Sequence, residues 1–370
     1  MSQHENEDKP HNVSPPGTPP GRNTSVLICI VAHLRDERHV RLFERTLESV
    51  LSLSTTDDVS ASVLVIDNAS LISVQNIVSQ RTRADVEVVH RHTNNLGAAR
   101  TDGLKRASEK KCEWIAYVDS DIELAIEWLM ILVRESQSNP MKDAVGLGTV
   151  NRPPPEGDFA RALDLFLGFE YMHLGSSQSL QLPTSTHQGI SKKKVKNLST
   201  CAAMFHVEAL YHAGGFDADF SRVCEDLEMS YRLRKNGSLW LLSAPVALHR
   251  QDRNTNQWAR RMFRYGWGQI EVARRHPEHL QTAKALPILA LLGVAIALLL
   301  PLIGRSAPIK LTIIGYLGFV CAPIILRGVS EGRMDTAFQA CWIAFVTHVS
   351  YSAGMWAGLL RLRKNPVIAP

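Results

Sequence analysis

Paired cysteines and metal-binding cysteine clusters are missing from this sequence of 370 residues. Its six cysteines are scattered along the chain, and no CxxC or Cys/His cluster occurs among them. This distribution argues against a disulfide framework and against a zinc site, and it suits a reducing compartment. A strong charge excess is missing too, because 41 Lys and Arg against 36 Asp and Glu leave a net charge of +5. So mild a balance gives no support for nucleic acid as a partner.

Two further sequence signals are absent. Residues 1–24 are polar and rich in proline, without the basic and apolar regions of a signal peptide. We therefore expect a disordered tail there and no export of the domain that follows. No GxGxxG follows the first apolar run, at residues 25–32, and this speaks against a dinucleotide-dependent Rossmann enzyme.

Short apolar runs alternate with helical patterns from residue 25 onward. The clearest runs of buried-strand length occupy residues 25–32, 62–66, 86–90 and 114–119. Such alternation is typical of βαβ units, in which a mostly parallel sheet is covered by helices on both faces. We therefore predict one α/β domain over residues 25–253.

Polar side chains follow these strands at the points where they end. One strand delivers Asp119 and Asp121, which point to the same face and can share one divalent cation. Asp67 ends an earlier strand, and Asn95 follows the third. The carboxyl ends of parallel strands meet at one edge, where open α/β sheets bind ligands. Taken singly, each residue is equally explained by an ordinary polar turn.

A second acidic motif, Glu225 and Asp226, opens a helical pattern that ends in basic residues and Gly237. Complementation of the helix dipole explains these acids as well as a catalytic role does. Residues 151–197 contain three consecutive prolines and a basic run, which fits a mobile loop over a cleft or a surface insertion.

The C-terminal part differs from the rest in its long apolar segments without charge. A segment rich in Arg and aromatic residues, within 254–284, precedes them and is expected to form an amphipathic helix at a membrane surface, with an ordinary basic surface helix as the alternative. We predict a membrane domain over 285–363, with two or three transmembrane helices rather than a hairpin of core helices. The predicted spans are about 285–303, 309–326 and 336–360.

The placement of these spans in the cell rests on weaker signals. The flanking basic residues do not decide the orientation. Because no export signal is evident, we expect the α/β domain in the cytoplasm and the chain as a multi-pass protein of the plasma (inner) membrane. His348, inside the last span, is expected to make a hydrogen bond in helix packing.

Residues 25–275 resemble glycosyltransferase family 2, whose members have the GT-A fold, use nucleotide sugars and invert the anomeric centre. The resemblance rests on four blocks in the family's order: the acidic strand end at 63–70, the helix start at 95–104, the DxD-type motif 119–121, and the acceptor-side block 214–217 with its acidic pair at 225–226. The chain departs from the family at residues 32–37, and again where Thr200 and Cys201 replace a common glycine.

This resemblance implies a metal-assisted single displacement and assigns roles to particular residues. Asp226 is expected to be the general base, supported by Glu225. The expected ligands of Mg²⁺ or Mn²⁺ are Asp121, Asp119 and His249. The residues expected to bind the nucleotide sugar are Ala32, Glu37, Asp67, Asn95, Arg100 and Asp119. Two alternatives stay open, since Asp119 could contact the ribose instead, and His249 could be a loop histidine beside a phosphate-binding Arg250.

The expected partners are a nucleotide-diphosphate sugar donor, a lipid-linked or cell-envelope saccharide acceptor and the membrane. The span arrangement is similar to that of exopolysaccharide-type members of the family, which act in polysaccharide biosynthesis. Residues 257–261 only half match the QxxRW motif of processive synthases, because Arg261 replaces the tryptophan. We therefore favour transfer of a single sugar over processive synthesis. A non-catalytic scaffold is the third possibility, and the retained carboxylates speak against it.

Overall fold

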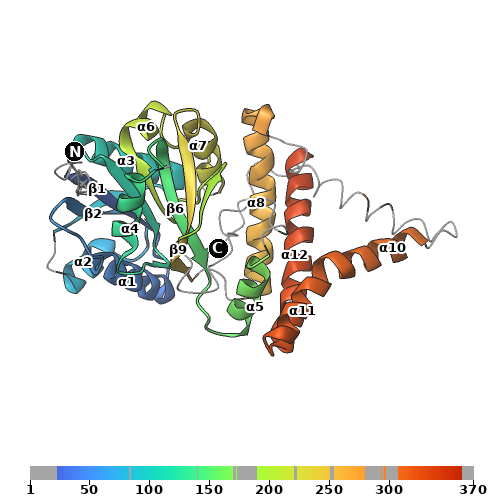
Figure 1. Ribbon diagram of the computed structural model, residues 1–370. Helices are drawn as coiled ribbons and strands as arrows, with labels where there is room; N and C mark the ends of the chain where they lie inside the picture. Colours follow the sequence, from blue (N-terminus) through green and yellow to red (C-terminus); the bar gives the residue numbers. More distant parts are fainter. Residues whose placement is uncertain are drawn as a thin grey trace, which may run out of the picture.

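A computed structural model describes residues 23–82, 85–139, 141–169, 172, 190–220, 223–250, 254–279, 293, 296 and 307–360. These residues form a layered α/β unit, beside which lies a layer of long helices (Figure 1). The strands are β1 (Thr24–Ala32), β2 (Val59–Asn68), β3 (Val86–Arg91), β4 (Trp114–Asp119), β5 (Ile122–Glu123), β6 (Ala144–Arg152), β7 (Lys192–Val195), β8 (Ala202–His206) and β9 (Ser238–His249).

Helices separate most of these strands and continue beyond the last one. Those of the α/β unit are α1 (Glu37–Leu51), α2 (Val74–Arg81), α3 (Leu96–Glu109), α4 (Trp128–Ser136), α6 (Val207–His212) and α7 (Glu225–Leu233). Those of the helical layer are α5 (Asp158–Leu167), α8 (Thr255–Arg275), α10 (Ala307–Tyr316), the π-helical turn η4 (Leu317–Cys321), α11 (Ala322–Ser330) and α12 (Met334–Leu359). A short 3₁₀ turn, η2 (Pro277–His279), follows α8.

The strands join into one sheet in the order β3-β2-β1-β4-β8-β6-β9-β5, with β7 also paired to β9. The long pairs β1–β2, β1–β4, β2–β3 and β6–β9 are parallel, whereas the short strands β5, β7 and β8 pair antiparallel. The predicted α/β class is confirmed. Parallel pairing brings the ends of β1, β2, β3 and β4 to one edge of the sheet.

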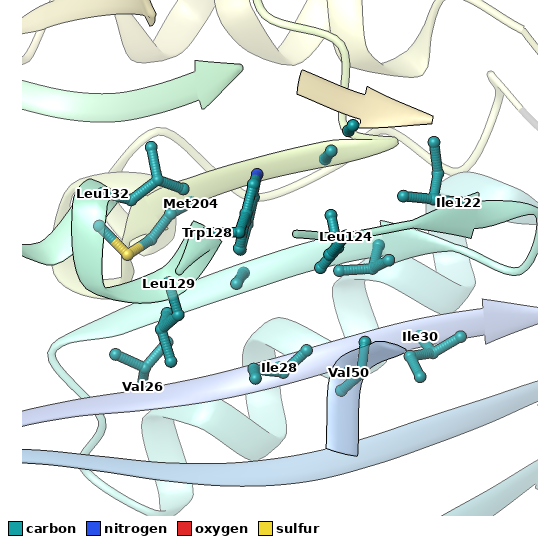
Figure 2. Packing of buried hydrophobic residues seen from close by; sticks show 14 of the residues in the cluster. Val26, Ile28, Ile30, Val50, Ile122, Leu124, Trp128, Leu129, Leu132 and Met204 are labelled. Carbon is teal, nitrogen blue, oxygen red and sulfur yellow. The ribbon is translucent and has the colours of Figure 1, made fainter. Parts of the chain in front are cut away.

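A hydrophobic core lies on each face of the sheet, because neighbouring residues of a buried strand point to opposite faces. Figure 2 shows one of them, where Ile28 and Ile30 of β1 pack with Val50 of α1 and with Trp128 and Leu129 of α4. The other core places β1, β4 and β8 against α3, α6 and α7. These two cores hold the strand ends, and therefore the polar groups at their tips, in fixed positions.

The helical layer has its own core, in which α5 and α8 pack against α12 (Figure 1). The indole Nε1 of Trp258 donates to Thr347 Oγ1 at 2.7 Å inside this core. The backbones of α8 and α12 come close enough that a Cβ on Gly354 would overlap the Phe263 carbonyl oxygen. The apolar face of α8, expected to rest on a membrane, therefore has a protein partner.

The structure gives a different account of residues 151–197 from the one expected. Strand β6 continues to Arg152, and α5 follows where a loop or an insertion was expected. Phe159 and Phe166 of α5 are buried against the C-terminal helices, which explains why residues 158–167 form a packed helix.

Only one helix in the described part of the chain, Ala307–Ser330, is long and apolar enough to cross a membrane by length and composition. It corresponds to the predicted span at 309–326. The predicted span at 285–303 lies outside the described residues except for Gly293 and Ile296. The span at 336–360 corresponds to α12, which buries one face against α5 and α8. A topology with several spans therefore stays a prediction.

Candidate functional site

Two carboxylates and one imidazole converge at the end of β4. Asp119 is the last residue of that strand, and Asp121 follows in the turn to β5. Strand β5 pairs antiparallel with the end of β9, opposing Ile122 to His249, and the Arg250 N–H donates to the Asp121 carbonyl oxygen at 2.9 Å. This pairing carries His249 to the acidic turn from a strand far along the chain.

The three side chains can offer ligand atoms that all lie within 4.8 Å of one another. His249 Nε2 lies 3.1 Å from Asp121 Oδ1. Two carboxylates and an imidazole form a donor set that suits Mn²⁺, and Mg²⁺ also binds such carboxylates. His249 is buried, while both aspartates are half-buried and keep contact with solvent. Asp119, Asp121 and His249, which we call the triad, therefore fit a divalent cation.

Asp121 and His249 of the triad shift each other's pKa even without a cation. Burial alone would raise the pKa of Asp121, but the charge and hydrogen bond of His249, together with the charges of Arg261 and Arg38, lower this pKa to about 2. Burial alone would lower the pKa of His249, whereas Asp121 and then Cys201 raise it to about 10. At neutral pH, the protonated imidazole of His249 thus supplies the positive charge beside Asp121. A metal cation that binds His249 would have to displace this proton.

Arg100 links the triad to the second acidic motif. Its Nη2 donates to Asp119 Oδ1 at 2.8 Å, and its Nη1 pairs with Glu225 Oε1. Only 2% of Arg100 is exposed. Burial would lower the pKa of the guanidinium, but Glu225 and Asp119 raise it above its ordinary value. The structure places Arg100 as a bridge between Asp119 and Glu225, and the expected approach of Arg100 to a nucleotide stays a prediction.

The acidic pair occupies the first turn of α7 and its two members differ in access. Glu225 is 4% exposed and is held by Arg100. Asp226 is half-buried, and its Oδ1 accepts the Leu227 N–H at 2.8 Å. Burial raises the pKa of both carboxyl groups, and the charge of Arg100 limits the rise. Asp226 is therefore the more accessible member of the pair, and its pKa is raised above the ordinary value of an aspartate.

The residues expected to hold the nucleotide are already engaged within the protein. Asp67 is 6% exposed, with Oδ1 accepting the Ser70 N–H at 2.9 Å and Oδ2 lying 2.8 Å from His90 Nδ1. Asn95 caps α3 by accepting the Ala98 N–H, and its Nδ2 donates to the Ala218 carbonyl oxygen at 2.9 Å. Both residues thus shape the strand-end loops.

The remaining two expected nucleotide contacts lie near β1. Ala32 has no exposed surface and pairs in register with Asp67 at the end of the sheet. The side chain of Glu37 is 91% exposed and forms an ion pair with Arg41. The structure does not bring Glu37 together with the triad by any contact among the described residues.

Sequence reasoning missed a polar network beside Asp67. His33 Nδ1 lies 3.0 Å from the Asn68 carbonyl oxygen, and His33 Nε2 lies 3.0 Å from Asn94 Nδ2. Asn68 in turn donates to Asn94 and accepts the Asn95 N–H. The signal was available, because His33 departs from the family pattern after the first strand and Asn94 precedes the expected Asn95.

Cationic side chains surround the triad from other elements. The charges of Arg261 on α8 and Arg38 on α1 both contribute to the lowered pKa of Asp121. Arg250, considered as a phosphate contact, instead holds Glu123 and Glu156 in ion pairs. Positive charge near the carboxylates is what a diphosphate requires.

The chain is similar in sequence to two named proteins. The pre-mycofactocin glycosyltransferase of Mycobacterium tuberculosis is 26% identical over 308 residues, covering 81% of this chain and 58% of that protein. The succinoglycan biosynthesis protein ExoA of Rhizobium meliloti is 27% identical over 164 residues, covering 44% of this chain and 48% of that protein. The chain thus spans less than two thirds of the length of either relative.

A solved structure shares the fold. The mannosyltransferase PcManGT of Pyrobaculum calidifontis, solved with GDP-Man and Mn²⁺, superposes with a TM-score of 0.56 at 15% identity and covers 96% of this chain and 92% of its own. The family model for glycosyl transferase family 2 matches residues 28–214, just over half of the chain, and that for glycosyl transferase family group 2 matches residues 158–357. The chain therefore belongs to glycosyltransferase family 2.

Proposed function

We propose that this protein is an inverting glycosyltransferase that moves one sugar from a nucleotide-diphosphate sugar to a hydroxyl group of a lipid-linked or cell-envelope saccharide. The observation that carries the proposal is the bridge of Arg100, which joins the triad to the acidic pair. A displacement at the anomeric carbon needs charge stabilisation for the leaving diphosphate and a base for the incoming hydroxyl. In this proposal, the triad at one end of the bridge stabilises the diphosphate, and the acidic pair at the other end supplies the base.

Each end of the site has a distinct task in this mechanism. Asp119, Asp121 and His249 would hold Mn²⁺ or Mg²⁺, which when bound neutralises charge on the diphosphate. Asp226 takes the proton of the acceptor hydroxyl as the bond to the anomeric carbon forms. Glu225, fixed by Arg100, holds the first turn of α7 in place. Asp226 is the accessible carboxylate of the acidic pair, and one base of this kind is what a single displacement requires on the acceptor side.

Arg261 and Arg38 support the donor side of the same proposal. Their charges reach Asp121, so a diphosphate bound at the triad would meet them as well. Asp67 and Asn95 would then contribute by holding the strand-end loops on which a nucleoside rests, instead of by direct hydrogen bonds. Ala32 would offer its backbone, since its side chain is buried.

The acceptor and the location are inferred from the helical layer. Apolar side chains on Ala307–Ser330 are strongly exposed, among them Leu311 at 68%, Phe319 at 68% and Leu326 at 69%. Figure 1 shows α10 extending away from the rest of the protein. Exposed apolar surface of this kind marks a membrane or protein contact. We place this helix in the plasma (inner) membrane and the catalytic domain in the cytoplasm, where a lipid-linked acceptor would meet Asp226.

The test is nucleotide release by detergent-solubilised protein supplied with UDP-, GDP- or dTDP-sugars and Mn²⁺. Membrane lipid extract provides acceptors. We expect one donor class to react and Asp226→Ala to lose roughly 10²–10⁴-fold in rate. Asp121→Ala should lose activity together with Mn²⁺ dependence. Asp57→Ala, an exposed aspartate before β2, is the matched control and should behave as the native protein.

Three results separate the proposal from its competitors. Release of nucleotide that survives both substitutions would contradict the assignment of the site. Long polymeric products would favour a processive synthase. Nucleotide binding without release, even with lipid extract present, would favour a non-catalytic scaffold.

A further inference from the structure

Cys201 lies directly behind the triad. It is 2% exposed and immediately precedes β8. Its carbonyl oxygen accepts the Asp119 N–H at 3.0 Å, and its side chain interacts with the imidazole of His249, whose pKa it helps to raise. One buried residue therefore contacts two of the three residues of the triad, one through the backbone and the other through the sulfur.

The sulfur of Cys201 is itself held by two polar side chains. Asn151 Nδ2 donates to Cys201 Sγ at 2.8 Å, and Ser199 Oγ lies 2.9 Å from the same sulfur. Asn151 is 2% exposed on β6, and its neighbour in the sheet is Ala247 of β9, the strand that carries His249. Asn151 thus holds the sulfur from the strand that pairs with the one carrying His249.

A histidine that binds a metal through one ring nitrogen usually donates its other N–H to an acceptor, and this outer contact fixes the tautomer and the ring orientation. A thiol sulfur is a weak acceptor, but it is able to fill this place. We propose that Cys201 is a positioning residue of the metal site, orienting His249 through its sulfur and Asp119 through its carbonyl oxygen. The inference rests on the metal site of the proposed function. It also gives a role to the position where the chain departs from the glycine common in the family.

The experiment measures Mn²⁺ binding to the full-length protein in detergent, by calorimetry in the presence of UDP or GDP. Cys201→Ala removes the sulfur, and we expect it to weaken Mn²⁺ binding roughly 10–100-fold. Cys201→Ser keeps a hydrogen-bonding group and should restore most of the affinity. Cys112→Ala, at a half-buried cysteine that follows α3, is the matched control and should leave the affinity unchanged.

Thermal unfolding of each variant shows whether it is folded. If folded Cys201→Ala binds Mn²⁺ as tightly as the native protein, the inference is overturned while the proposed function stands. If the native protein binds no Mn²⁺ with either nucleotide, the metal site and the inference both fail. Should Cys201→Ala not fold, Asn151→Ala decides the matter, because it removes the donor that holds the sulfur, and native Mn²⁺ affinity in this variant would overturn the inference.

Discussion

Replacing Arg100 by Met should destabilise the protein more than any substitution of a surface arginine. Arg100 is 2% exposed and stands between Asp119 and Glu225, of which Glu225 is itself 4% exposed. Removing one partner of a buried ion pair leaves the other charge without compensation, which costs about 3–5 kcal/mol. At roughly 2–4 °C per kcal/mol for a domain of this size, the melting temperature should fall by roughly 6–20 °C.

The assay is thermal unfolding in detergent at pH 7, followed by circular dichroism. Arg106→Met is the matched control, because Arg106 lies on the same helix, α3, and pairs with Glu87 and Glu109 at the surface. Exposed ion pairs contribute about 0–1 kcal/mol, so this variant should melt close to the native protein. The double variant Arg100→Met/Glu225→Gln should recover part of the loss, because it also removes the uncompensated carboxylate.

Activity should respond to the same change. Without Arg100, Asp119 loses the donor that orients it, and Glu225 is driven toward its protonated form by burial. We expect weaker Mn²⁺ binding and a lower kcat together. A melting temperature for Arg100→Met within 2 °C of that of Arg106→Met would refute the view that the bridge holds the site.

Two further expectations concern the triad and the helical layer. The folded-state pKa of His249, about 10, exceeds its ordinary value of 6.5, so its contribution to stability is complete below pH 6.5 and is lost as the pH rises through 10. In EDTA, the melting temperature of the native protein should therefore fall more between pH 7 and pH 10.5 than that of His249→Gln, and parallel curves would contradict the ion pair with Asp121. Gly354→Ala should lose about 1–3 kcal/mol by pressing α12 off α8. The control Gly315→Ala meets nothing within 4 Å on α10, so equal melting temperatures for the two variants would show that the helices do not pack closely.

The strands and the acidic turn after β4 were predictable because their signal is local. A buried strand is an apolar run, and the alternation of strands with helices already implies where the strand ends meet. Asp119 and Asp121 needed nothing beyond that reasoning. His249 remained ambiguous because β5, the strand that brings it to Asp121, is two residues long and has no recognisable pattern.

The bridge of Arg100 could not be derived from the sequence. A charged residue within a helix is ordinarily solvated, and nothing local distinguishes the buried Arg100 from the partly exposed Arg106 on the same helix. Glu225 was equally well explained by the dipole of α7. Only the tertiary arrangement, which places α3 and α7 on the same face of the sheet, reveals that the two charges need each other. Helix α5 was missed for the same reason, because its partners lie on α8 and α12.

Helix α8 packs between the acidic pair and the rest of the helical layer, so it links the positions of the two. On one side, a Cβ on Gly268 would come within 2.6 Å of the sulfur of Cys224, the residue that opens α7 in a left-handed conformation with φ of 63°. On the other side, Trp258 is hydrogen-bonded to α12, and a Cβ on Gly266 would overlap the Tyr351 carbonyl oxygen of that helix. Because Cys224 immediately precedes Glu225, a shift of α8 would change the backbone that aims Asp226. The position of the proposed base is thus set by contacts from both the sheet and the helical layer, and this explains why α8 carries glycine on both of its packed faces.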